Sequence, residues 1–99
     1  MYNKLNELKK YLRIDSDLTE DDDLLNSLAD TAIEYVEQST GKKYIENNIF
    51  DLTIKLLVAH WYENRKIMTD SKNLTAELPF SANLLIKHIA LSNSFEVKT

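Results

Sequence analysis

The chain has 99 residues, of which 43% are hydrophobic, and its formal net charge is −4. This length allows one domain with a modest core, and the absence of cysteine excludes disulfides and thiolate metal sites. No apolar run approaches the roughly 18 residues that span a bilayer, and the first ten residues lack the apolar core of a signal peptide. We therefore expect a chain that neither enters a membrane nor is exported.

The charge is unevenly distributed along the chain. Residues 1–40 carry four basic and ten acidic side chains, whereas residues 41–99 carry eight basic and six acidic ones. An acidic chain without a basic stripe is a poor candidate for binding DNA along its phosphates, and such asymmetry favours protein partners with complementary patches. Only one glycine and one proline occur, which favours a few long elements, mainly helices, over an all-β domain.

The first half of the chain predicts two helices. Leucines at spacings of three and four in residues 3–12 indicate a short amphipathic helix. After an acidic connector, Thr19 is a candidate N-cap for a helix over about 20–39, and Gly41 is expected to end it in the left-handed conformation. The apolar positions of this second helix cover more than one narrow stripe, which predicts contact with two neighbouring elements.

A third helix is predicted over about 49–66. At 100° per residue its apolar side chains fall on one face within roughly 100°. The expected core anchors are Phe50, Ile54, Leu57 and Trp61. Trp61 is therefore interpreted as a packed core residue rather than a platform for a nucleic-acid base, while Tyr62 points elsewhere and is expected to be exposed at an interface.

Residues 68–78 have no helical period and predict a long loop, or two short strands (67–69 and 74–76) around a turn. Ser81 is a candidate cap for a last helix over about 82–92, and the tail 93–99 is expected to fray unless its apolar residues find a surface. The sequence therefore predicts an all-α bundle of about four helices. We expect it to form one domain over 1–99, with a loop at 68–78 and a flexible tail.

Few residues indicate a catalytic, metal or cofactor site. His60 and Glu63 share a helical face, as two metal ligands would, but no third ligand is evident. The favoured interpretation is that His60 lies beside the buried face, with one ring nitrogen bonded to a backbone or carboxylate partner. The acidic run that starts at Asp15 fails the calcium-loop pattern, and neither a glycine-rich phosphate loop nor a nucleophile elbow occurs. We therefore expect no enzyme activity, no cofactor and no metal.

Four motifs in order resemble one family. They are LRIDSDLTEDDDLL (12–25), AIEYVEQSTGKKY (32–44), LLVAHWYENRK (56–66) and ELPFSANLLI (77–86). Together they cover roughly residues 5–90, and they are similar to the head–tail connector proteins of tailed bacteriophages and prophages, the ring adaptors beneath the portal.

The resemblance implies a structural subunit at the head–tail interface of the virion, assembled in the bacterial cytoplasm. Its partners would be copies of itself in a ring, the portal protein and the next head-completion or tail protein. DNA would pass through the ring without sequence-specific binding, and an acidic wall at Asp21, Asp22 and Asp23 would let it slide. The resemblance carries over no catalytic residue.

The predicted interface combines the expected exposed residues of the third helix with the loop that follows it. Its members are Tyr62, Arg65, Thr69, Asp70, Ser71, Lys72, Asn73, Leu74, Thr75 and Ala76. The main alternative function is a small helical prophage-encoded regulator or protein-binding module. A helix-turn-helix DNA-binding protein is disfavoured by the acidic charge, and a metal-dependent hydrolase based on His60 and Glu63 is the weakest hypothesis.

Overall fold

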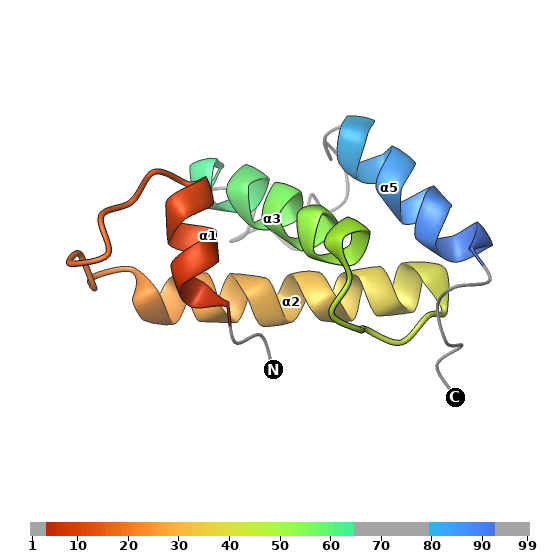
Figure 1. Cartoon of the computed structure of the whole chain (residues 1–99), viewed down its shortest axis with the longest axis horizontal. Helices are drawn as coiled ribbons and strands as arrows, with labels where there is room; N and C mark the ends of the chain where they lie inside the picture. The colour runs from red at the N-terminus through yellow and green to blue at the C-terminus, as the bar shows by residue number, and fades with distance from the viewer. Residues whose placement is uncertain (1–3, 65–79, 93–99) are drawn as a thin grey trace.

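The computed structural model describes residues 4–64 and 80–92, and this part of the chain folds into four helices without a strand. These are α1 (Leu5–Tyr11), α2 (Asp22–Thr40), α3 (Asn48–Glu63) and α5 (Phe80–Leu91), which Figure 1 shows as a small bundle. The prediction of an all-α bundle is confirmed. The predicted loop or hairpin at 68–78 and the tail at 93–99 lie outside the described residues.

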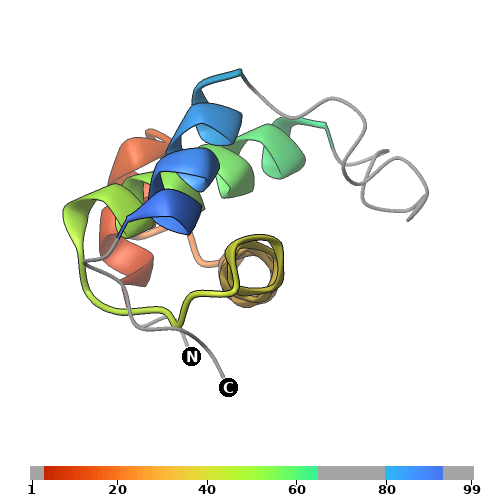
Figure 2. The ribbon, with the colours of Figure 1, turned by 90° about the vertical axis from the view of Figure 1, so that its right-hand side faces the viewer.

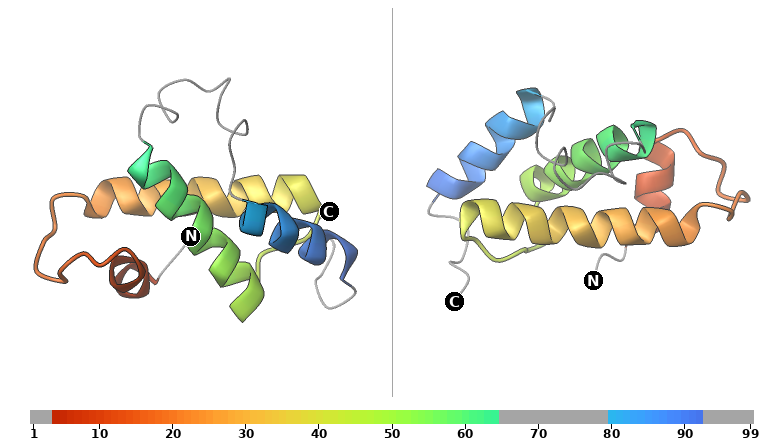
Figure 3. Two further views of the ribbon diagram at one scale, coloured as in Figure 1. Left: turned by 90° about the horizontal axis from the view of Figure 1, so that it is seen from above. Right: turned by 180° about the vertical axis from the view of Figure 1, so that it is seen from behind.

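The long helix α2 is the base on which the other helices pack. It contacts α1, α3 and α5, and α3 also contacts α5. Viewed nearly along α2, both α3 and α5 lie on one side of it (Figure 2). From above, α3 crosses the middle of α2, while α1 and α5 lie toward opposite ends (Figure 3). The helix α2 thus has three neighbours rather than the two expected, because its apolar positions extend around more than one face.

The core lies between α2, α3 and α5. The four apolar side chains of α3 that share one face, Phe50, Ile54, Leu57 and Trp61, are all fully buried. The ring of Tyr35 on α2 meets the indole of Trp61 edge-on, with centroids 6.1 Å apart. Small residues line the facing side of α2 and let the helices approach closely. The other buried apolar residues are Leu8, Leu25, Leu28, Ala29, Ala32, Val36, Val58, Ala82 and Ile89.

The residues found at two helix ends explain the local structure there. Gly41 has φ +70°, the left-handed conformation expected at the C-terminus of α2. The side chain of Asn47 caps α3, because its Oδ1 accepts from the backbone N–H groups of Ile49 at 2.8 Å and Phe50 at 3.3 Å.

Two predicted caps are wrong. Helix α2 begins at Asp22 with Asp21 at its N-cap position, and the backbone carbonyl of Thr19 instead accepts from the N–H of Asp22 in a preceding turn. Ser81 lies inside α5, which begins at Phe80. After Thr19 several successive residues can serve as a cap, so local sequence alone does not select among them, whereas at Ser81 the helix begins one residue before the candidate cap. None of the helices in the described ranges combines the length and apolar character that crossing a membrane requires.

Candidate interaction surface

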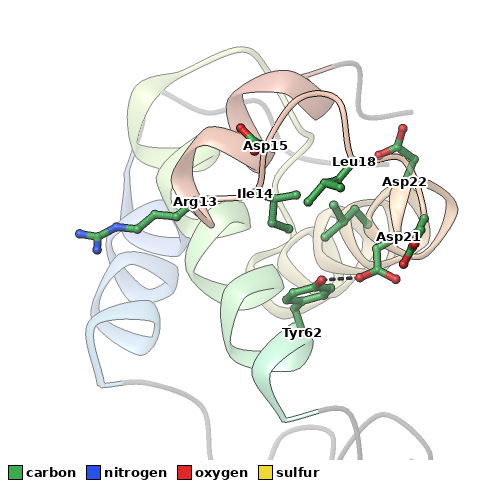
Figure 4. Close-up of a pocket in the computed structure, with 9 residues that line it drawn as sticks. Arg13, Ile14, Asp15, Leu18, Asp21, Asp22 and Tyr62 are labelled. Carbon is green, nitrogen blue, oxygen red and sulfur yellow. Dashed lines mark hydrogen bonds between the residues drawn. The ribbon is translucent and has the colours of Figure 1, made fainter.

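A hollow of about 370 Å³ opens where the α1–α2 connection, the start of α2 and the end of α3 meet (Figure 4). Its walls are partly apolar and partly acidic. The lining residues are Arg13, Ile14, Asp15, Leu18, Glu20, Asp21, Asp22, Leu25 and Tyr62. In Figure 4 the guanidinium of Arg13 points away from the labelled carboxylates, so the acidic character of the hollow is not offset by this cation.

A buried lysine shapes the connection that forms one wall of the hollow. The side chain of Lys9, on α1, is only 3% exposed. Its ammonium donates to the backbone carbonyls of Leu18 at 2.6 Å and Ser16 at 3.3 Å, and to Asp22 Oδ1 at 2.9 Å. An ammonium has three protons to donate, and a buried cation is costly without partners. Lys9 therefore ties the acidic connection and the first turn of α2 to α1.

The chain leaves α1 through a Schellman-type turn. The N–H of Ile14 donates to the carbonyl of Lys9 at 2.8 Å, and the N–H of Arg13 donates to that of Lys10 at 3.1 Å. Arg13 has φ +61°, a left-handed conformation that usually favours glycine. This turn directs the chain into the connection that Lys9 holds.

Tyr62 closes the opposite wall of the hollow. Its hydroxyl donates to the carboxylate of Asp21, which joins the end of α3 to the start of α2 (Figure 4). The ring packs against the core and is only partly exposed. Tyr62 is therefore less exposed than expected, because its ring packs against the core and its hydroxyl has a partner, and its role at an interface stays a prediction.

A second polar cluster fastens α1 to the start of α3. Asp51 is 6% exposed and receives the ammonium of Lys4 at 2.8 Å and the hydroxyl of Tyr44 at 2.7 Å. The ring of Tyr44 also meets Phe50 edge-on, with centroids 4.9 Å apart. The hydrogen bond to Asp51 raises the pKa of Lys4 above its ordinary value of 10.5, against a smaller opposing effect of desolvation. This cluster joins the start of α1 to the α2–α3 connection and α3, across 47 residues of sequence between Lys4 and Asp51.

The other candidate residues divide into two groups. Arg65 and the loop positions Thr69–Ala76 lie outside the described residues, so their role at an interface stays a prediction. His60 is partly exposed and Glu63 is exposed on α3. Within residues 4–64 and 80–92 no three histidine or acidic side chains gather as a metal site would require.

Sequence reasoning missed two features of this region. Lys9 is adjacent to the exposed Lys10, and helical spacing is the signal that separates them. Lys9 follows Leu5 by four residues and precedes Leu12 by three, so it lies on the apolar face of α1. The acidic connection that follows was noted, but its pairing with a buried cation depends on how the chain turns back.

An apolar stripe lies on α5, toward the other end of the bundle. Phe80, Leu84 and Leu91 are 76%, 51% and 84% exposed. At 100° per residue they fall within about 40° of one another, on the side of α5 opposite the buried Ala82 and Ile89. The structure thus presents two distinct surfaces, the acidic hollow and this stripe.

The comparisons with known proteins agree with a structural role. No curated protein and no solved structure matches the chain. The family described as phage gp6-like head–tail connector protein matches residues 2–89, nearly the whole chain. An all-helical bundle whose most distinctive surfaces are a hollow and an apolar stripe suits a protein that acts by assembling with others. The chain belongs to the phage gp6-like head–tail connector family.

Proposed function

We propose that the protein is a ring-forming subunit of the head–tail connector. The ring docks beneath the portal, extends the DNA channel and presents a surface to the next head-completion or tail protein. The observation that carries this proposal is the family match over residues 2–89. A small helical domain gains stability from association with copies of itself, and a closed ring requires two different patches on each subunit.

The charge distribution supports a channel role for part of the acidic connection. Asp21 bonds to Tyr62 and Asp22 to Lys9, so replacing them disturbs the fold as well as any channel wall. Asp17 and Asp23 are exposed and do not line the hollow. We assign the channel-facing charge to these two carboxylates, which would repel DNA phosphates and let the genome slide.

The experiment that tests the ring is reconstitution with the portal. The purified protein is mixed with portal assemblies of its own phage, and the complexes are imaged by electron microscopy. We expect extra density of one ring, with the rotational symmetry of the portal, on the tail-facing side. The same mixture with an unrelated ring assembly is the control. Portals that stay bare at saturating protein concentration would contradict the proposal, whereas monomeric elution of the free protein agrees with a ring that closes on its docking surface.

The channel assignment has its own test. Phage particles that carry Asp17→Asn together with Asp23→Asn should form intact rings but deliver their genome less efficiently. Ring formation is read by imaging and genome delivery by infectivity per particle. The matched control is Glu46→Gln with Glu63→Gln, which removes the same charge from two exposed positions that do not line the hollow. Infectivity equal to that of the control would contradict the channel role given to Asp17 and Asp23.

A further inference from the structure

The exposed stripe on α5 has the character of a contact surface. Three large apolar side chains, Phe80, Leu84 and Leu91, lie on one narrow face of a twelve-residue helix and are each more than half exposed. Single exposed apolar residues are common, but an aligned group of this size marks an interaction site more often than a solvated face. The face points away from the core, because the buried Ala82 and Ile89 occupy the opposite side of α5.

The hollow at the other end has a complementary surface. The ring of Tyr62 and the aliphatic side chains of Ile14, Leu18 and Leu25 contribute to its lining. Leu18 is 57% exposed at this position. With a volume of about 370 Å³, the hollow falls within the range of roughly 300–1,000 Å³ found for sites that enclose a ligand. It is therefore large enough to receive protruding apolar side chains.

The charges around the two surfaces are opposite in sign. Helix α5 contains no acidic residue, and Lys87 lies on the stripe, between Leu84 and Leu91. The hollow carries the exposed carboxylates of Asp15 and Glu20. An apolar contact that also contains a pair of opposite charges gives both affinity and a defined orientation. This complementarity selects the hollow as the surface that fits the stripe.

The two surfaces belong to opposite ends of one molecule. The α1–α2 connection lies beyond the N-terminus of α2, whereas α5 lies toward its C-terminal end, and the views in Figures 1 and 3 agree on this. The stripe of one chain therefore does not reach the hollow of the same chain. A contact between two different patches on identical chains is heterologous, and its repetition produces a ring when the rotation closes.

We propose that the α5 stripe of one copy docks into the acidic hollow of the next copy. The occupant of the hollow is thus a second copy of this chain. The inference rests on the proposed ring function, for which it names the contact between neighbours. Phe80, Leu84 and Leu91 supply the apolar side chains, and Lys87 faces the carboxylates at the hollow.

Cysteine cross-linking tests this contact directly, because the natural chain contains no cysteine. Leu84→Cys and Leu18→Cys introduce one thiol on each surface, at positions of similar exposure. Each variant is oxidised alone, and the two are oxidised as a mixture, both free at high concentration and bound to portal assemblies. We expect a cross-linked dimer mainly in the mixture, and a ladder of oligomers from the double variant. Ser27→Cys, exposed on α2 away from both surfaces, is the control partner.

A charge reversal provides a second measurement that does not depend on apolar packing. Lys87→Glu on the Leu84→Cys chain should slow formation of the mixed dimer several-fold at low salt, with a smaller difference at high salt. Lys10→Glu makes the same change at an exposed site on α1, which lies toward the opposite end of α2 from α5, and should have little effect. Equal slowing by both variants overturns the role given to Lys87.

The possible results test the proposed contact and the proposed ring function separately. A cross-link of Leu84→Cys with itself would indicate a symmetric α5–α5 dimer and would overturn the proposal. If rings are visible on the portal but no mixed cross-link forms, the proposed function stands and the proposed contact is contradicted. A mixed cross-link with bare portals supports the contact and refutes the connector role. Absence of both rings and cross-links rejects both.

Discussion

The apolar core and the corner formed by α1 are held together by different physical interactions. Around Trp61, α2, α3 and α5 bury apolar side chains, and the described contacts there are mainly hydrophobic. At the N-terminal corner, α1 contributes few buried apolar residues, and Lys9 and Lys4 attach it through hydrogen bonds and ion pairs. An apolar core tolerates similar residues of similar volume, whereas a buried cation needs its particular acceptors. We therefore expect the corner to depend more on residue identity than the bundle does.

The largest expected effect comes from removing a large side chain from the core of the bundle. Trp61→Ala removes the largest fully buried side chain and should lower the free energy of unfolding by about 3–5 kcal/mol. Because Trp61 is the only tryptophan, urea denaturation is followed by far-ultraviolet circular dichroism rather than by fluorescence.

Trp61→Phe is the matched control. The indole Nε1 has no hydrogen-bond partner in the described part of the chain, so this change removes volume without breaking a bond and should cost about 1–2 kcal/mol. Equal losses for both variants would show that the bundle requires the shape of the indole itself, and that the bulk of an aromatic ring does not suffice.

The contribution of the N-terminal corner is tested by removing the positive charge of Lys9 while keeping a side chain of similar size. Lys9→Met retains an unbranched side chain but leaves two carbonyls and the Asp22 carboxylate without their donor. We expect a loss of about 2–3 kcal/mol, with faster hydrogen exchange in the α1–α2 connection than in α3. Lys10→Met, at the exposed neighbouring position, should change stability by less than about 0.5 kcal/mol. Similar losses for the two lysines would refute the role of Lys9 as the fastening residue.

The smallest expected effects distinguish the two left-handed positions. Gly41→Ala should destabilise by about 1 kcal/mol; a Cβ there would meet nothing within 4 Å, so the cost comes from the backbone alone. Arg13→Gly relieves the same backbone strain but raises the entropy of the unfolded chain, and should stabilise by about 0.5–1 kcal/mol. Thermal unfolding of both variants measures the difference, and changes of the same sign would contradict it.

The family match indicates a role in assembly. The N-terminal corner, around Lys9, contributes both to folding and to the proposed contact between copies. Lys9 positions the backbone around Leu18, which lines the hollow proposed to receive a neighbouring copy. A change at Lys9 should therefore weaken the contact between copies in addition to the subunit itself.

Much of the fold followed from local patterns. The periodic leucines of residues 3–12 and the apolar face of the third helix each correspond to a helix in the structure. Gly41 ended α2 as expected, because its left-handed conformation is a local requirement that glycine meets at least cost. The cap at Thr19 was wrong because Asp21, an equally suitable cap residue, lies two residues further on, and the cap at Ser81 was wrong because α5 already begins at Phe80.

The sequence by itself determined the helices and the buried face of α3, since these depend on the spacing of apolar residues along one segment. Only the tertiary structure decided that Lys9 pairs with Asp22 and with carbonyls of the α1–α2 connection, and that Tyr62 bonds to Asp21 from 41 residues away. It also placed the hollow and the stripe at opposite ends of the molecule. The physical reason is that such features arise from the packing of segments distant along the chain, which local periodicity does not encode.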